Sequence, residues 1–219
     1  MILLNGTSYQ QITKRLMDIV FALILLAIFL IPSVILAFII KLTSKGPIFA
    51  DVPERIGQFG NTFRMYKFRS MIENAHKILR NDPQFKELYE EYKKKSYKLQ
   101  NDPRITSIGT FIRKHSLDEL PQIINVLKGE MSIVGPRAYY PDELTNQQKK
   151  YPQTKVQVKK VLKAKPGITG LWQVSGRSEV HFDERIILDA EYVANISLYN
   201  DLKIIIKTPL IMLTGKGAI

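Results

Sequence analysis

The feature that most constrains this chain is an uninterrupted apolar run, because no charged residue occurs between Ile19 and Ile40. About 20 apolar residues are enough for a helix to cross a bilayer. The run is too long for a cleavable signal peptide, and no small-residue cleavage site follows it. We therefore expect this chain of 219 residues to be attached to a membrane near its N-terminus.

The same run contains an interruption, Pro32 followed by Ser33, a little past its middle. Proline removes a backbone donor and clashes with the preceding turn, so a break is expected there. Lys14 and Arg15 precede the run and Lys41 follows it. Because positive charge prefers the cytoplasmic side, cations on both flanks conflict with a spanning helix. We favour a re-entrant helix–break–helix over the alternative, a spanning helix with a proline kink.

Charge and composition limit the function classes. The net charge of +12 and the pI near 9.7 indicate an anionic partner, which could be nucleic acid, a membrane surface or a phosphorylated substrate. The apolar run argues against a soluble nucleic-acid binder, so no nucleic acid is expected as a partner. The absence of cysteine excludes disulfides and thiolate metal sites, and three scattered histidines do not suit a zinc site.

The rest of the chain predicts an α+β fold that is mostly helical. A turn at Gly46-Pro47 divides an N-terminal segment, 1–45, from a cytoplasmic membrane-associated catalytic domain, 46–219. Alternating residues over 48–68 predict a small β-hairpin, which delivers Lys67 and Arg69. Helices are expected over 70–79, 84–100 and 117–127, with a short amphipathic element over 105–114 and a shaped loop over 166–177. Amphipathic helices over 184–196 and 201–213 could lie in the membrane interface or pack on the protein core.

The candidate chemistry lies in the run 116–122, where Asp118 and Glu119 are adjacent carboxylates. Arg113 precedes them and Arg137 follows in a second turn. Acids beside cations that suit phosphate indicate chemistry on a phosphate ester. A carboxylate that attacks phosphorus needs a metal or arginines to offset the charge clash.

A structural explanation of the same run is that Ser116 and Glu119 form a capping box at a helix start. Adjacent helical residues project about 100° apart, so capping would occupy Glu119 and leave Asp118 without a structural role. Arg137, in turn, could merely tie the turn before it to the core.

Nine motifs in this order and spacing resemble the bacterial sugar transferases, the monotopic phosphoglycosyl transferases, which move a sugar 1-phosphate from a nucleotide diphosphate sugar to polyprenol phosphate. The resemblance covers residues 14 to about 218. Besides the proline-broken apolar run, the motifs lie at 14–18, 46–49, 54–57, 67–71, 102–106, 116–122, 132–137 and 166–170.

The resemblance implies a double displacement. Asp118 would be the nucleophile that expels UMP from a UDP-sugar, and undecaprenyl phosphate would then take the phosphosugar. Glu119 would bind Mg²⁺, and Lys67, Arg113 and Arg137 would hold phosphate groups. The reaction would be the first membrane step of a surface polysaccharide or glycoconjugate, on the cytoplasmic face of the bacterial inner membrane.

Ala138 departs from the family, which usually has proline after the arginine of this motif. The chain is expected to be the short form, without the several N-terminal membrane helices of larger members. A membrane-anchored binding protein without activity is the alternative, and the joint presence of Asp118, Glu119, Arg113 and Arg137 argues against it. The sugar, the pathway and a homo-oligomeric state stay open.

Overall fold

The computed structural model describes residues 9–95, 97, 99, 101–176 and 180–214, and these are mostly helical. The longest helices are α2 (Lys14–Thr43), α10 (Phe182–Ala194) and α11 (Leu198–Thr214). Shorter α-helices are α3 (Ala75–Asn81), α4 (Lys86–Lys94), α5 (Ser107–Lys114), α6 (Gln122–Lys128), α7 (Pro141–Lys150), α8 (Lys155–Val161) and α9 (Leu171–Val174). A π-helical turn, Tyr9–Thr13, and 3₁₀ turns at Gln58–Gly60, Pro83–Phe85, Leu117–Glu119 and Pro152–Thr154 connect them.

Two small sheets complete the fold and confirm the predicted α+β class. β1 (Arg55–Ile56) pairs antiparallel with β2 (Thr62–Phe63), which is the predicted hairpin. β3 (Ser132–Val134) pairs parallel with β4 (Gly167–Thr169), a pairing that the sequence did not reveal. The second sheet brings the turn after β3 beside the segment that the sequence had suggested was only a loop.

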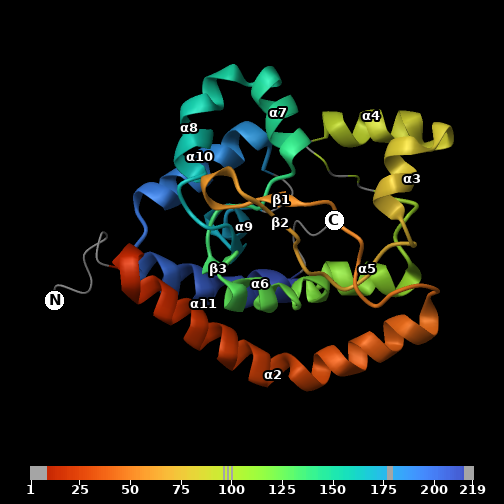
Figure 1. Ribbon diagram of the computed structural model, residues 1–219, viewed down its shortest axis with the longest axis horizontal. Helices are drawn as coiled ribbons and strands as arrows, with labels where there is room; N and C mark the ends of the chain where they lie inside the picture. Colours follow the sequence, from red (N-terminus) through yellow and green to blue (C-terminus); the bar gives the residue numbers. More distant parts are fainter. Residues whose placement is uncertain (1–8, 96, 98, 100, 177–179, 215–219) are drawn as a thin grey trace.

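Helix α2 carries the apolar run and is the described helix long and apolar enough to cross a membrane, with a mean hydropathy of 3.2 over 18 residues. The expected break is a bend, because the helix continues through Pro32 and Ser33. Figure 1 shows α2 as two limbs that meet at an obtuse angle, with the rest of the molecule on the inner side of the bend. We assign the bend to Pro32, whose missing N–H removes one helical hydrogen bond.

Both ends of α2 bind the same body of protein. Near its start, the Arg15 guanidinium donates to the backbone carbonyls of Val126 and Leu127 at 2.6 and 2.9 Å. Just past its end, the backbone carbonyl and hydroxyl of Ser44 accept hydrogen bonds from Arg69 at 2.8 and 2.7 Å. The two ends of the apolar helix therefore lie on one side of its bend.

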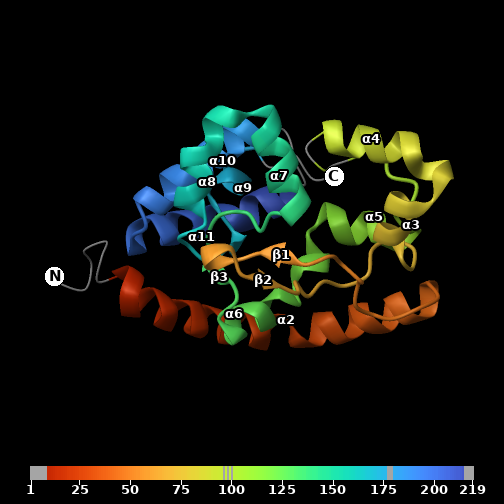
Figure 2. The same cartoon turned by 45° about the horizontal axis from the view of Figure 1, so that its top comes forward.

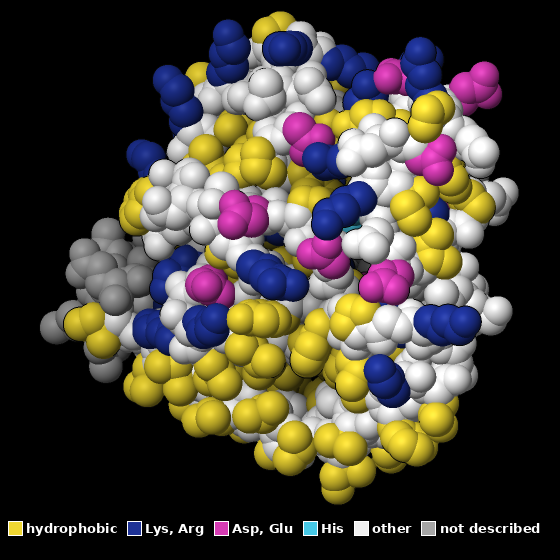
Figure 3. Space-filling model, turned by 45° about the vertical axis from the view of Figure 1, so that its right-hand side comes forward, with side chains coloured by type: hydrophobic (Ala, Val, Ile, Leu, Met, Phe, Trp, Pro, Cys, Tyr) yellow, Lys and Arg dark blue, Asp and Glu magenta, His cyan; other side chains and the backbone are white. Residues whose placement is uncertain are grey.

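The convex side of α2 is an apolar surface. Ile31 is 71% exposed, and Val34, Phe38 and Leu42 are also more than half exposed. In Figure 3 hydrophobic side chains cover the lower edge of the molecule, where α2 lies, and lysines and arginines border them above. An apolar surface this large needs a membrane or a partner to cover it, which agrees with the predicted membrane association.

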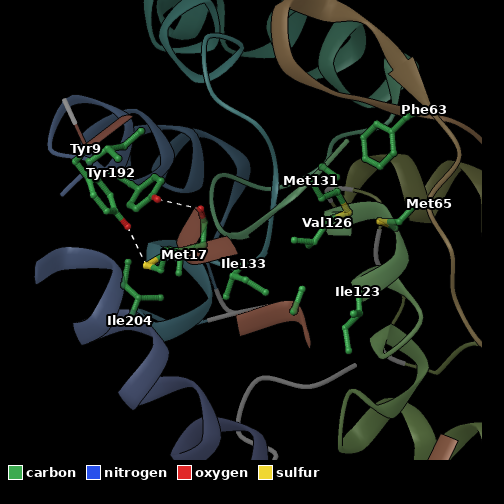
Figure 4. Packing of buried hydrophobic residues seen from close by; sticks show 14 residues of the cluster. Tyr9, Met17, Phe63, Met65, Ile123, Val126, Met131, Ile133, Tyr192 and Ile204 are labelled. Atoms are coloured by element: carbon green, nitrogen blue, oxygen red, sulfur yellow. Dashed lines mark hydrogen bonds between the residues drawn. The ribbon is translucent and has the colours of Figure 1, made fainter. Parts of the chain in front are cut away.

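The largest buried cluster joins α2 to the C-terminal helices. Tyr9 donates a hydrogen bond to the Met17 sulfur at 3.0 Å, and Figure 4 shows Tyr192 and Ile204 beside this pair. Lys14 and the two tyrosines also bind Asp201 of α11, each at 2.7 Å. The N-terminal segment is therefore fixed to α10 and α11; the predicted division at residue 45 stays a prediction.

Several predicted bounds are wrong. The helix predicted over 70–79 begins only at Ala75, after Asn74 in the left-handed conformation at φ 56°. The helix predicted over 84–100 is α4 alone, and residues 96, 98 and 100 lie outside the described part. The helix predicted over 117–127 is a 3₁₀ turn followed by α6, because Pro121 has no N–H to continue the helical hydrogen bonds between them. The expected loop at 166–177 contains β4 and α9, with residue 177 undescribed.

The two predicted amphipathic helices differ. Helix α10 buries Phe182, Ile186 and Ala190 in a core cluster with α8, so it packs on protein and is not interfacial. Helix α11 buries Ile204 but leaves Ile206 and Leu210 at 70% and 65% exposed. Figure 1 shows the starts of α2 and α11 close together, where Lys14 binds Asp201.

Candidate active site

One cavity of about 450 Å³ gathers all five residues proposed from the sequence: Lys67, Arg113, Asp118, Glu119 and Arg137. They come from the end of the hairpin, from α5 and the turn after it, and from the turn after β3. Figure 2 shows these elements packed between α2 on one side and α7 on the other. The fold therefore places the expected acids and cations in the wall of a single cavity.

The acids lie on a 3₁₀ turn, and the capping explanation is wrong. Ser116 has a left-handed backbone at φ 55°, and its side chain makes no capping hydrogen bond to the following turn. Asp118 is buried, and its backbone carbonyl accepts a hydrogen bond from the Phe68 amide at 2.9 Å. This bond attaches the turn to the end of the hairpin, directly beside Lys67.

Lys67 bridges the two carboxylates. Its Nζ lies 2.6 Å from Glu119 Oε1 and 3.6 Å from Asp118 Oδ2. Burial raises the pKa of Asp118, while the nearby Lys67 and then Arg113 oppose the rise and the Glu119 charge adds to it. The result is a poorly solvated carboxylate whose anionic form depends on the cations around it, which suits a nucleophile.

The turn that carries Arg137 is firmly held although Ala138 replaces the usual proline. Its hydrogen bonds are Gly135 N–H to Thr169 O (2.9 Å), Gly167 N–H to Pro136 O (2.9 Å), Arg137 N–H to Asp189 Oδ2 (3.1 Å) and Arg55 Nη1 to Ala138 O (3.0 Å). β4 approaches so closely that a Cβ on Gly135 or Gly167 would collide with the facing backbone. Parallel pairing and these bonds fix the turn without proline.

The Arg137 side chain has both proposed kinds of contact. Its guanidinium lines the cavity and lies 5.3 Å from the centre of the Trp172 ring. Its Nε is also 3.8 Å from the buried carboxylate of Glu143, which accepts a hydrogen bond from Arg185 at 3.1 Å. Burial is the largest influence and lowers the pKa of Arg137, but Glu143 and the surrounding tyrosines together outweigh it and raise the pKa. Arg137 is therefore both anchored to the core and presented to the cavity.

Other cavity residues were not proposed as site residues. Arg69 is buried, and its burial lowers its pKa while Glu73 opposes the change. Arg55 lies over the Tyr140 ring, 3.3 Å from its centre. Burial, with Arg55 next in importance, lowers the pKa of His76 to about 3, so this imidazole is neutral. Arg69 could have been found, because residues two apart in an extended segment share a face and Lys67 was already proposed.

Glu119 is the predicted ligand of Mg²⁺ in this cavity. Within the described ranges there is no cluster of three or more His, Asp or Glu side chains that could hold a metal ion. The Glu119 carboxylate is 28% exposed at the cavity. Mg²⁺ commonly uses one or two carboxylates with substrate phosphates and water, so this donor set fits the predicted ion.

Comparison with known proteins decides the family. The sequence profile of the bacterial sugar transferases matches residues 9–215. The chain belongs to this family. The resemblance inferred from the motif order is thereby confirmed, and this member of the family can be compared with its relatives.

The chain is 45% identical over 214 residues to the undecaprenyl-phosphate galactose phosphotransferase of Salmonella typhimurium, covering 95% of this chain and 42% of the relative. It is 36% identical over 207 residues to the UDP-glucose:undecaprenyl-phosphate glucose-1-phosphate transferase of Escherichia coli, covering 92% and 40%. It is 41% identical over 199 residues to the exopolysaccharide production protein ExoY of Rhizobium meliloti, covering 89% and 83%. The chain spans about two-fifths of the length of the first two relatives.

Proposed function

We propose that this protein transfers a sugar 1-phosphate from a UDP-sugar to undecaprenyl phosphate and releases UMP. The observation that carries the proposal is the buried Asp118 beside Glu119, with Lys67 bridging both in a cation-lined cavity. The names of the Salmonella and Escherichia coli relatives support the two substrate classes. The relatives' names include both galactose and glucose, so they do not select one sugar for this protein.

In the first step an Asp118 carboxylate oxygen attacks the phosphorus that carries the sugar. A new oxygen–phosphorus bond forms, and the bond between this phosphorus and the bridging oxygen of the diphosphate breaks. The bridging oxygen leaves with the electron pair as part of UMP. Lys67 is placed to keep Asp118 anionic before the attack, because its Nζ is 3.6 Å from the carboxylate.

In the second step a phosphate oxygen of undecaprenyl phosphate attacks the same phosphorus. The bond to Asp118 breaks, and the carboxylate recovers its electron pair. The product is a sugar joined to the lipid by a diphosphate. A covalent intermediate divides one displacement between two anions into two steps, each assisted by the same cations.

Charge neutralisation is the main task of the other residues. Arg113 and Arg137 line the cavity with Lys67, where they would hold phosphate oxygens during both steps. Glu119 would hold Mg²⁺, which supplies Lewis-acid stabilisation of phosphate charge when bound. Arg69 is an additional buried cation in the same wall.

The bent α2 suits a lipid acceptor. Because both of its ends bind the same body, the helix would enter and leave one leaflet, with residues 46–214 on the cytoplasmic face of the inner membrane. This arrangement would hold the cavity next to the leaflet that contains the acceptor phosphate. The shared attachment of Arg15 and Ser44 to one body supports the re-entrant form over a spanning helix.

A panel of UDP-sugars, with and without undecaprenyl phosphate, tests the proposal on the purified full chain. One UDP-sugar should give UMP and a lipid-linked product in equal amounts, and Asp118→Asn should give neither. Binding of a UDP-sugar without any UMP would instead support the membrane-anchored binding protein. No binding and no turnover with the whole panel would contradict the proposed donor class.

A further inference from the structure

A second cavity, of about 270 Å³, lies between α9, α10 and α11. It is lined by Leu171, Val174, Ser175, Glu191, Tyr192, Asn195, Asn200, Lys203, Ile204 and Lys207. None of these residues lines the larger cavity. The proposed transfer reaction therefore leaves this cavity without a role.

The charge of this cavity is set by two exposed lysines and one acid. Lys203 and Lys207 are one helical turn apart on α11, and Glu191 lies on α10. Within the described residues no ion pair joins Glu191 to either lysine, and no acid lies within 4.0 Å of their ammonium groups. Two unpaired ammonium groups beside the Ser175 hydroxyl and the Asn200 side chain suit an anion with several oxygens, such as a phosphate.

The position of the lysines on α11 indicates where this anion comes from. At about 100° per residue, Lys203 and Lys207 project between the exposed apolar stripe of Leu202, Ile206 and Leu210 and the buried Ile204. The start of α11 is joined to the start of the apolar helix α2, since Lys14 of α2 binds Asp201 of α11. An interfacial helix places such a stripe among acyl chains and its lysines at the depth of the headgroups.

We propose that this cavity binds the phosphate of an anionic phospholipid of the surrounding bilayer. Lys203 and Lys207 would hold the phosphate, the cavity would take the headgroup, and the acyl chains would lie along the stripe of α11. A free phosphate ion would not use the stripe. The bound lipid would fix the angle at which α11, and through Asp201 the start of α2, meets the membrane.

Native mass spectrometry of the full chain in neutral detergent tests this site with phosphatidylglycerol and phosphatidylcholine as probes. Wild type should retain one phosphatidylglycerol more tightly than phosphatidylcholine. Lys203→Gln/Lys207→Gln should weaken that binding about tenfold or more, without weakening phosphatidylcholine binding. Lys203→Arg/Lys207→Arg should retain it, because the charges remain.

Lys155→Gln/Lys159→Gln on α8 is the matched control, since both residues are exposed, have the same spacing and remove the same charge. Figure 1 shows α8 at the far end of the molecule from α2. The control should bind phosphatidylglycerol like wild type, and UMP release by both glutamine pairs in detergent should be unchanged. Equal lipid affinity in the α11 variant and wild type, or an equal loss in the control, would overturn the proposal.

Two competition experiments identify the occupant. Millimolar inorganic phosphate should leave the phosphatidylglycerol bound, and displacement would assign the cavity to a soluble phosphate. Undecaprenyl phosphate should compete no better than phosphatidylglycerol, and stronger competition would assign the cavity to the acceptor substrate. Either displacement would overturn the bilayer lipid as occupant, while leaving the proposed transfer reaction untouched.

Discussion

Lys67 lies between two carboxylates that have different roles in the proposed reaction. Glu119 is bonded to it at 2.6 Å and is partly exposed, whereas Asp118 is buried and 3.6 Å away. A cation near a buried acid lowers its pKa, and here it partly offsets the rise caused by burial. Lys67 therefore controls the pH range in which Asp118 can act as a nucleophile.

Lys67→Met should lower kcat/KM about a hundredfold or more, because it removes a charge that faces the phosphates. Activity should fall as pH decreases, since Asp118 becomes protonated. The acidic limb of the pH profile should lie at higher pH in the variant, because the pKa of Asp118 rises without the ammonium. Initial rates from pH 5 to 9 measure this, with Lys149→Met as an exposed control. If the acidic limb of the pH profile lies at the same pH in wild type and variant, Lys67 does not influence the ionisation of Asp118.

Arg137→Lys should lower kcat/KM about tenfold to a hundredfold, because lysine cannot form two parallel hydrogen bonds to a phosphate. Arg137→Ala should lower kcat/KM further, because it removes the charge as well. The melting temperature should change little, since Arg185 remains bonded to Glu143. Kinetics and thermal unfolding of the same samples separate catalysis from anchoring. A decrease in stability parallel to the activity loss would assign Arg137 to the core, and a fully active Arg137→Ala would contradict both roles.

Among the elements, the existence of α2 could be predicted from composition, but its bent shape could be predicted only in part. The apolar run and Pro32 predicted an interrupted membrane helix, and the structure has one bent helix. What the run could not show is that Arg15 and Ser44, at opposite ends, bind to the same body. These contacts depend on residues more than 20 positions away in the sequence.

Cysteines at Asn5 and Lys45 test the proposed re-entrant form of α2 in intact cells. Both should resist an impermeant thiol reagent, because both ends of the run would lie on the cytoplasmic side. The native chain has no cysteine to interfere. Pro32→Ala restores a helical donor and should increase labelling of position 5. Labelling of position 5 alone in the parent protein would establish a spanning helix.

Short-range sequence patterns predicted the β1–β2 hairpin, but they did not predict the β3–β4 sheet. β1 and β2 are joined by five residues, but β3 and β4 are three residues each and far apart along the chain. The turn at Asp118 was misread for another reason. Ser116 and Glu119 have the spacing of a capping box, yet Pro121 has no N–H and cannot donate the backbone hydrogen bond that one continuous α-helix needs there. Pro121 is therefore the sequence signal that marks the boundary between this turn and α6.

For the whole molecule, Asp189 couples folding to pH. It is fully buried, and burial raises its pKa to about 7, although bonds from Tyr139 and the Arg137 amide oppose the rise. Because an unfolded aspartate has a pKa near 4, the folded protein binds the extra proton between about pH 4 and 7. The contribution of Asp189 to the free energy of unfolding is therefore complete below pH 4 and is lost as the pH rises to 7.

Asp189→Asn should remove this component of the pH dependence, which amounts to a few kcal/mol. The asparagine oxygen can still accept the Arg137 amide, which keeps the turn in place. Denaturant unfolding at pH 4.5, 6 and 7.5 compares the free energies of unfolding of the two proteins. Wild type should lose more stability than the variant over this interval. If the free energy of unfolding changes equally with pH in both proteins, Asp189 does not bind the extra proton of the folded state.

The residues of the candidate site could be predicted from the sequence, but the way they come together in space could not. Asp118, Glu119, Lys67, Arg113 and Arg137 follow from the motifs, but their meeting depends on the Phe68–Asp118 backbone bond and the β3–β4 pairing. Both are long-range contacts between very short segments, which carry little pattern of their own. Trp172 and Glu143, which position Arg137, were missed for the same reason.

The central claim, that Asp118 forms a covalent bond to the phosphosugar, is tested most directly by trapping. The full chain is incubated with a UDP-sugar labelled in the phosphate next to the sugar, without undecaprenyl phosphate, and the denatured protein is analysed for bound label. Wild type and Glu119→Gln should retain label, the latter more slowly, and Asp118→Asn should retain none. Addition of undecaprenyl phosphate before denaturation should release the label from wild type. Equal labelling of Asp118→Asn and wild type would contradict the account.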